Sequence, residues 1–222
     1  MENNRIKTRV FYEKRGRAKY ISHLDINRLM QRVLKRAGLP VWYTEGFNPH
    51  MYLTFALQLS LGYESVYECM DFHLTREMDF AEVKQILNDN LPEGLRVNDV
   101  AAPVHKIAEI AAADYMITLA ADCPAEELLR DFREFLDTDT IEVVKKTKRG
   151  EHTVNIRPDL TLLALDSTED AVVCRMRFPA GSEKNYNPSL LLDAFTAQTG
   201  IALTRCAVLR TDVYCKDGSS FR

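Results

Sequence analysis

Apolar side chains in the first hundred residues follow two different periods. Short alternating runs predict strands, and two longer stretches with apolar residues three or four positions apart predict helices. The first helix is expected to begin at Ser22, whose spacing to Asp25 is typical of a helix N-terminus, and to end at Gly38. The expected elements follow in the order β-α-β-β-α-β: 5–12, 22–37, 41–43 with 52–61, 65–74, 79–91 and 95–100.

The second half repeats this order of elements without a visible repeat of its sequence. Its expected elements are 114–121, 124–136, 141–147, 151–156, 160–166, 171–178, 187–200 and 201–214. We therefore expect an α+β protein with two tandem ferredoxin-like (βαββαβ) domains, each a mostly antiparallel sheet with helices on one face. The domains are expected at 1–103 and 104–222, and the second carries a basic β-hairpin at 141–157.

Composition places the chain among ordinary globular proteins. It has 222 residues, of which 46% are hydrophobic and 27% charged, which excludes a mainly disordered chain, a collagen and a coiled coil. There is no run of about 18 apolar residues that would predict a membrane helix, and the polar start predicts no secretory signal. Five scattered cysteines without a CxxC pair favour reduced thiols. We therefore expect a cytoplasmic protein without membrane contact.

Charge is distributed unevenly, although the net charge is only −3. Residues 1–50 contain eleven basic and four acidic side chains, whereas residues 106–140 contain three basic and nine acidic ones. A chain with one basic region can present a surface to a polyanion without a basic overall pI. The basic first half is therefore one expected part of a nucleic-acid-binding surface, to which basic side chains of the second half also contribute.

Two clusters in this basic half are candidate binding sites. In the first, Lys19 and His23 precede or open the first helix, where backbone N–H groups favour an anion, and Arg28 and Arg32 share one helix face. The alternative is a helix cap followed by a solvated face. The second cluster is a turn-rich loop with ring side chains that suit stacking on RNA bases, or that fill the core instead: Phe47, His50 and Tyr52.

The expected hairpin at 141–157 is the third candidate. Its basic side chains suit contact with a nucleic-acid backbone, and a charged tip that only protects a sheet edge is the alternative. The binding residues predicted here are Lys146, Lys148, Arg149 and Arg157.

Several common catalytic and metal-binding patterns are missing from the sequence. It contains no P-loop, no GxGxxG after a strand, no GxSxG, no HExxH and no CxxxCxxC. Its histidines lack neighbours at metal-ligand spacing. We therefore expect neither a metal nor another cofactor.

The same segments resemble the bacterial radical-SAM-linked family of unknown function. The resemblance covers nearly the whole chain and is carried by KYISHLD (19–25), AGLP (37–40), YTEGFNPH (43–50), LSLGYES (59–65) and VNIRP (154–158). It implies a radical SAM protein as partner and supplies no catalytic residues. A basic residue often follows the Pro-His pair in that family, whereas Met51 and Tyr52 stand here, which weakens a phosphate-binding role for that position.

A more distant likeness is to CRISPR-associated RNA-processing proteins, which also consist of tandem ferredoxin-like domains. Some of them cleave RNA with a histidine near the first helix. This is an analogy of fold, and the glycine-rich loop of that group has no convincing equivalent in the present sequence.

Three functions are consistent with these observations. The first is an RNA-binding accessory module that works with a radical SAM enzyme in tRNA or rRNA modification. The second is a metal-independent ribonuclease that uses His23 or His50 as general acid or base. The third is a protein-interaction scaffold for the radical SAM partner, with the acidic helix at 126–139 as its docking surface.

Overall fold

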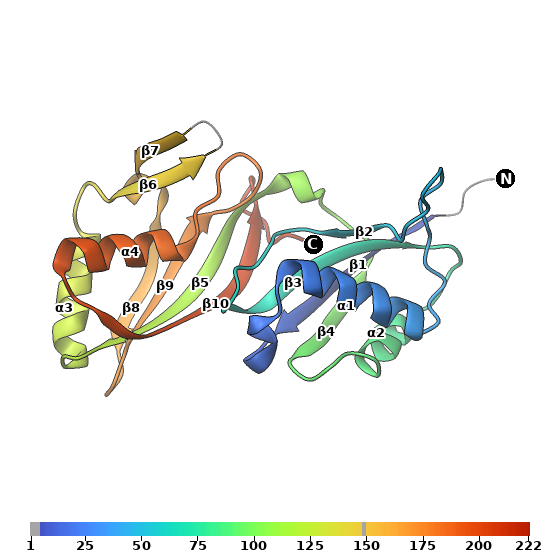
Figure 1. Ribbon diagram of the computed structural model, residues 1–222, viewed down its shortest axis with the longest axis horizontal. Helices are drawn as coiled ribbons and strands as arrows, with labels where there is room; N and C mark the ends of the chain where they lie inside the picture. Colours follow the sequence, from blue (N-terminus) through green and yellow to red (C-terminus); the bar gives the residue numbers. More distant parts are fainter. Residues whose placement is uncertain (1–4, 148–149) are drawn as a thin grey trace. The chain divides into compact units, whose positions relative to one another are not determined.

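The computed structural model describes residues 5–147 and 150–222 and has an α+β fold, as the sequence predicts. The chain forms two compact units (Figure 1). The first unit extends to Glu109 and includes Ser220–Arg222, and the second is Ile110–Ser219. The division therefore lies six residues after the expected one at 103/104, and the last residues of the chain return to the first unit.

The first unit contains an antiparallel sheet in the order β4-β1-β3, with β2 paired to the other side of β3. The long strand expected over 52–61 is only three residues here, because the chain bends at 56–57 directly after Phe55. A turn follows at 60–63, in which Tyr63 N–H donates to Ser60 O and Gly62 has a φ of 85°. The elements are β1 (Ile6–Lys14), η1 (Gly16–Tyr20), α1 (His23–Arg36), β2 (Leu53–Phe55), β3 (Glu64–Leu74), α2 (Phe80–Asn88), β4 (Leu95–Ala101) and η2 (Ile107–Glu109).

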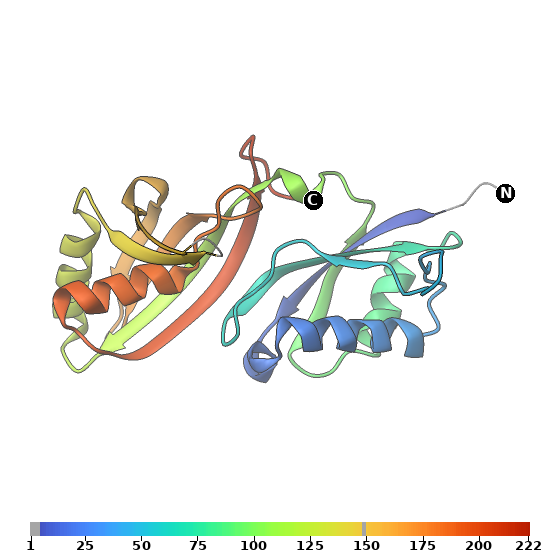
Figure 2. The same cartoon turned by 45° about the horizontal axis from the view of Figure 1, so that its top comes forward.

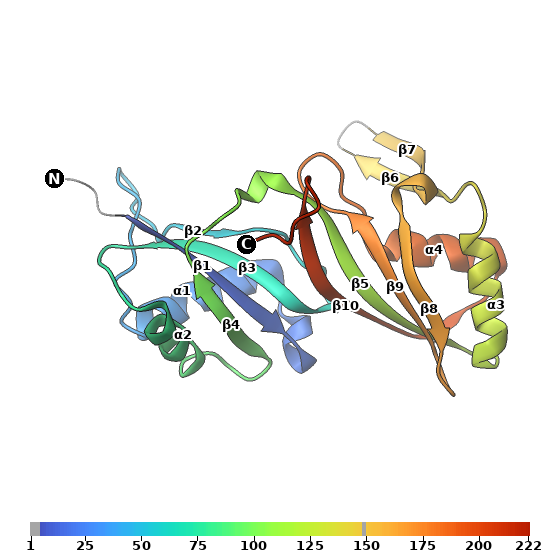
Figure 3. The same ribbon diagram turned by 180° about the vertical axis from the view of Figure 1, so that it is seen from behind.

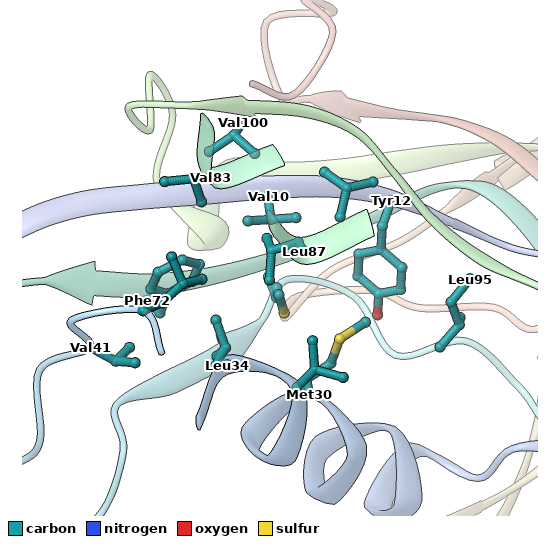
Figure 4. Packing of buried hydrophobic residues seen from close by; sticks show 14 of the residues in the cluster. Val10, Tyr12, Met30, Leu34, Val41, Phe72, Val83, Leu87, Leu95 and Val100 are labelled. Carbon is teal, nitrogen blue, oxygen red and sulfur yellow. The ribbon is translucent and has the colours of Figure 1, made fainter. Parts of the chain in front are cut away.

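Helices α1 and α2 pack on the same face of this sheet. Met30 and Leu34 of α1 and Leu87 of α2 are completely buried, in one cluster with Val10 of β1 and Phe72 of β3 (Figure 4). Full burial of each such side chain contributes roughly 1.5–3 kcal/mol. This packing fixes the buried side of α1 and leaves its opposite side to solvent.

The other face of the same sheet carries a buried ion pair. Arg9 of β1 is 1% exposed and donates to both carboxylate oxygens of Asp71 on β3, at 2.7 and 2.8 Å. Its third nitrogen donates to the carbonyls of His105 and Arg222, both at 2.9 Å, and its guanidinium lies 4.3 Å from the Phe221 ring centroid. The C-terminal residues are thereby held on the face of the sheet that α1 and α2 leave open (Figure 3).

The second unit has an antiparallel sheet in the order β10-β5-β9-β8, and β6 and β7 form a separate hairpin that packs against α4 (Figure 2). Phe195 of α4 contacts Phe132 and Phe135 of α3 edge-on, at 5.1 and 5.4 Å between centroids. The elements are β5 (Ile110–Ala121), α3 (Ala125–Leu136), β6 (Glu142–Thr147), β7 (Gly150–Asn155), η3 (Arg157–Asp159), β8 (Thr161–Ser167), β9 (Val172–Pro179), α4 (Pro188–Thr199) and β10 (Leu203–Cys215).

An ion pair also joins β5 and β9 of the second unit. Arg177 of β9 donates to both oxygens of Asp114 on β5, at 2.6 and 3.0 Å, and its guanidinium lies 3.8 Å from the Tyr214 ring centroid. In the first unit the arginine lies on the unit's first strand, β1, and the carboxylate on β3. In the second unit the carboxylate lies on the unit's first strand, β5, and the arginine on β9. None of the helices in the described parts of the chain has the length and apolar character needed to cross a membrane.

Candidate nucleic-acid interface

A hollow of about 510 Å³ lies between the solvent side of α1 and the loop at 43–51, which follows α1 in the chain. It unites two of the three clusters predicted from sequence, because Arg28 and Arg32 form one wall and His50 belongs to the other. We call it the aromatic hollow. Its lining residues are Arg28, Gln31, Arg32, Lys35, Tyr43, Pro49, His50 and Met51.

The helical wall of the aromatic hollow is positively charged. Arg28 pairs with Asp25 at 3.2 Å, but these side chains are 69% and 58% exposed, and such surface pairs are worth only about 0–1 kcal/mol. Within residues 5–147 and 150–222, the side chains of Arg32 and Lys35 form no ion pair or hydrogen bond. An incoming phosphate would therefore displace no strong interaction from this wall.

The loop wall is held in shape by hydrogen bonds between Thr44 and His50. Thr44 N–H donates to His50 O at 2.8 Å, and His50 N–H donates to Thr44 Oγ1 at 3.0 Å. The His50 ring places Nδ1 3.0 Å from Thr44 Oγ1 and 3.2 Å from Asn48 O. A carbonyl oxygen only accepts, so the contact with Asn48 favours the tautomer with the proton on Nδ1. Nε2 is then the nitrogen left for a ligand.

Phe47 lies at the tip of this loop and is fully exposed. Gly46 precedes it with a φ of 122°, a backbone angle that side chains disfavour. An exposed ion pair of 2.9 Å joins Glu45, at the start of the loop, to Arg5, the residue before β1. A solvent-exposed phenylalanine on a braced loop offers both faces of its ring to a stacking partner.

Tyr52 does not line the aromatic hollow, because it belongs to a separate layer of rings. It stacks on His73 at 4.6 Å between centroids and lies 5.9 Å from Trp42, whose ring carries the Arg5 guanidinium at 3.9 Å. Burial lowers the pKa of His73, and the nearby charges of Lys7 and Arg5 lower it further. Neither Trp42 nor His73 was predicted from the sequence as a site residue. The single tryptophan beside the basic segment was the only signal for them.

His23 and Lys19 also lie outside the lining of the aromatic hollow. His23 is the first residue of α1, and its ring contacts Phe55 edge-on at 5.3 Å. Ser22 caps the helix as predicted, accepting from Asp25 N–H at 3.2 Å. The hydrogen bond from the Ser22 hydroxyl lowers the pKa of Asp25, so this carboxylate is ionised at neutral pH. Lys19 lies 5.3 Å from the Tyr20 ring centroid.

Two basic residues of the segment expected as a hairpin, 141–157, make internal contacts in the second unit. Lys145 Nζ donates to Asn185 O at 3.2 Å, and Arg157 Nε donates to Leu136 O at the end of α3 at 2.5 Å. Lys148 and Arg149 lie outside the described residues, as does the side chain of Lys146. Arg157 therefore has a structural task that its position in the sequence did not reveal.

The described residues contain no cluster of side chains suited to a metal ion. No group of three or more histidine, cysteine, aspartate or glutamate side chains in them is placed to hold an ion. No disulfide joins the cysteines of these residues either. The lining of the aromatic hollow itself offers guanidinium, ammonium, imidazole and phenol groups.

Comparison with known proteins identifies a family. The model of the family described as "Uncharacterized protein conserved in bacteria (DUF2344)" matches residues 7–188, and the chain belongs to this family. Curated proteins give no match. Among solved structures, the chain is similar to one from "Crystal Structure of a Cbf5-Nop10-Gar1 Complex", with 11% identity and a TM-score of 0.48.

That likeness covers 93% of this chain and 48% of the other, so this chain spans about half the length of the structure it matches. A likeness of this degree carries no argument about substrate or partner.

Proposed function

We propose that this member of the DUF2344 family binds single-stranded RNA through the aromatic hollow of its first unit. The observation that carries the proposal is the convergence of Arg28, Arg32 and Lys35 with Tyr43 and His50 around one hollow. Cationic side chains attract phosphates, and ring faces stack on bases, which is the combination used for single strands.

Single-stranded RNA fits this surface better than a duplex does. In a duplex the base faces are stacked on one another, and the ring of Phe47 or Tyr43 could reach them only after unpairing. The exposed Phe47 and the braced loop beside it thus favour unpaired nucleotides, as found in loops and ends of tRNA or rRNA.

Binding of a labelled single-stranded oligoribonucleotide to the full chain, measured by fluorescence anisotropy over a range of salt concentrations, tests the proposal. Arg32→Ala should weaken binding and reduce the salt slope by about 0.7, the contribution of one phosphate contact on a single strand. Arg175→Ala is the matched control, because it removes an exposed arginine from β9 in the second unit. No binding at low salt, or equal losses in both variants, would overturn the proposal.

We also propose that both units are ferredoxin-like domains and that the protein acts as an accessory module for a radical SAM enzyme. The strand orders support the fold assignment: if the hairpin β6-β7 is set aside, each sheet has its last strand next to its first and its third next to its second. The partner rests on the sequence resemblance alone. A pull-down from cells with and without nuclease tests this partnership. Recovery of a radical SAM protein under both conditions supports direct contact, and its absence under both conditions would contradict the proposed partner.

RNA cleavage is a second candidate, favoured by the position of His50 beside the cationic wall. With Nδ1 held by Asn48 O, its Nε2 could exchange a proton with a ribose hydroxyl. Incubation of RNA with the wild type, His50→Gln and His23→Ala separates the two functions. Cleavage that is lost in one of these variants would favour the nuclease, and an intact RNA with the wild type would remove it. Recovery of the partner without RNA would favour the scaffold function.

A further inference from the structure

A second hollow of about 470 Å³ lies on the other flank of α1. Its apolar part consists of Ile21, Leu29, Val33 and Pro92, and polar side chains stand around it. We call it the apolar hollow. Its lining residues are Ile21, Asp25, Arg28, Leu29, Arg32, Val33, Arg36 and Pro92.

Arg28 and Arg32 line both hollows and therefore form a cationic ridge between them. The two residues are four positions apart on one helix, so their Cα atoms lie about 6 Å apart along its axis. A group bound in either hollow is thus within reach of the same two guanidinium groups. A linear polyanion could cross the ridge without leaving them.

We propose that the RNA strand crosses α1 with two adjacent nucleotides in the two hollows and the phosphate between them on Arg28 and Arg32. This deepens the proposed function and rests on it. One base lies against Tyr43 and His50 in the aromatic hollow. Its neighbour lies on the apolar side chains of the apolar hollow.

The chemistry of the apolar hollow suits a base. Its size falls within the range of small-molecule sites, which are mostly apolar with a few fixed polar groups. Arg36 at its border is held by Asn90, through Nε at 3.2 Å from Asn90 Oδ1 and through a second bond to the Asn90 carbonyl. This contact keeps the border of the hollow in place.

Asp25 adds a hydrogen-bond acceptor to the lining of the apolar hollow. The ionised carboxylate accepts only, and its two oxygens already accept from the Ser22 hydroxyl at 2.7 Å and from Arg28 at 3.2 Å. Remaining lone pairs can accept from ring or amino N–H groups on a base edge. The footprint is therefore one nucleotide stacked on rings and one held by apolar contact and a carboxylate.

Methyl NMR of the full chain tests the footprint directly. Met51 reports on the aromatic hollow, and Leu29 and Val33 report on the apolar hollow. The probes are uridine 5′-monophosphate, single-stranded pentanucleotides and a short RNA duplex. We expect the pentanucleotides to shift all three reporters together, and the duplex to shift them far less.

The outcomes separate this proposal from the proposed function. Shifts of Met51 alone on binding of a pentanucleotide would overturn the two-nucleotide footprint and leave RNA binding standing. Absence of any shift and of any binding would overturn both.

A pair of variants gives a second measurement. Leu29→Gln makes the floor of the apolar hollow polar and should weaken pentanucleotide binding about five-fold without changing its salt slope. Leu24→Gln on the same helix is the matched control, because Leu24 is 68% exposed and lies outside both linings. Equal affinity of the two variants would also overturn the footprint.

Discussion

Removal of the Asp71 carboxylate should destabilise the first unit more than removal of any surface charge. Arg9 is 1% exposed, and two of its four hydrogen bonds, at 2.7 and 2.8 Å, go to Asp71. Among the described residues, Asp71→Ala leaves the buried guanidinium with the carbonyls of His105 and Arg222 as its acceptors. Breaking one partner of a buried pair costs about 3–5 kcal/mol, because the remaining charge stays desolvated. We expect a loss of this size in the free energy of unfolding.

Urea unfolding monitored by tryptophan fluorescence measures this loss of stability in the first unit of the chain. Trp42 is the only tryptophan of the chain and belongs to the first unit. Glu45→Ala is the control, because it removes an exposed carboxylate that pairs with Arg5 at 2.9 Å, and such a pair is worth about 0–1 kcal/mol. If Asp71→Ala unfolds within about 1 kcal/mol of the wild type, the ion pair does not stabilise the fold as argued.

Three further changes test other parts of the structure. Phe47→Leu should weaken single-stranded RNA binding by about 1–3 kcal/mol while Phe47→Trp preserves it, since stacking needs a ring face; equal anisotropy titrations of the two variants would contradict this. The hydrogen bond from Lys184 lowers the pKa of Asp159. The stabilisation from this bond is therefore present above the ordinary carboxyl pKa and is lost as the pH falls through the lowered pKa. An Asp159→Asn variant should accordingly lose less stability than the wild type in acid unfolding curves below about pH 4. Gly181→Ala should cost about 2 kcal/mol or more in thermal unfolding, because φ is 128° and the added Cβ would lie 2.2 Å from Ile110 O; an unchanged melting temperature would show that the loop relaxes freely.

Local signals in the sequence predicted the elements well. The Ser22 cap, the helix after it and the pairing of β6 with β7 follow from capping and turn residues, which act over three or four positions. The α+β class follows from the same signals. The end of the expected strand at 52–61 was misplaced, because apolar residues continue after Phe55 at Ala56, Leu57 and Leu59, where the chain has left the strand.

The candidate site could be predicted only in part, because its residues meet through tertiary packing. Arg28 and His50 were each proposed as binding residues, but their common hollow depends on how the 43–52 loop returns beside α1. Arg9 and Lys14 belong to the basic residues of the first half, but both are buried: Arg9 pairs with Asp71, and Lys14 donates to Ile21 O at 2.7 Å. A sum over sequence positions does not distinguish these two kinds of charge.

The exchanged polarity of the two ion pairs has a consequence for folding fidelity. Arg9 faces Asp71 in the first sheet, and Asp114 faces Arg177 in the second. If the first strand of one unit paired by mistake with the third strand of the other, Arg9 would meet Arg177 or Asp114 would meet Asp71. Like charges placed side by side at these partly buried positions repel each other. The opposite placement of arginine and carboxylate in the two units therefore disfavours this mispairing.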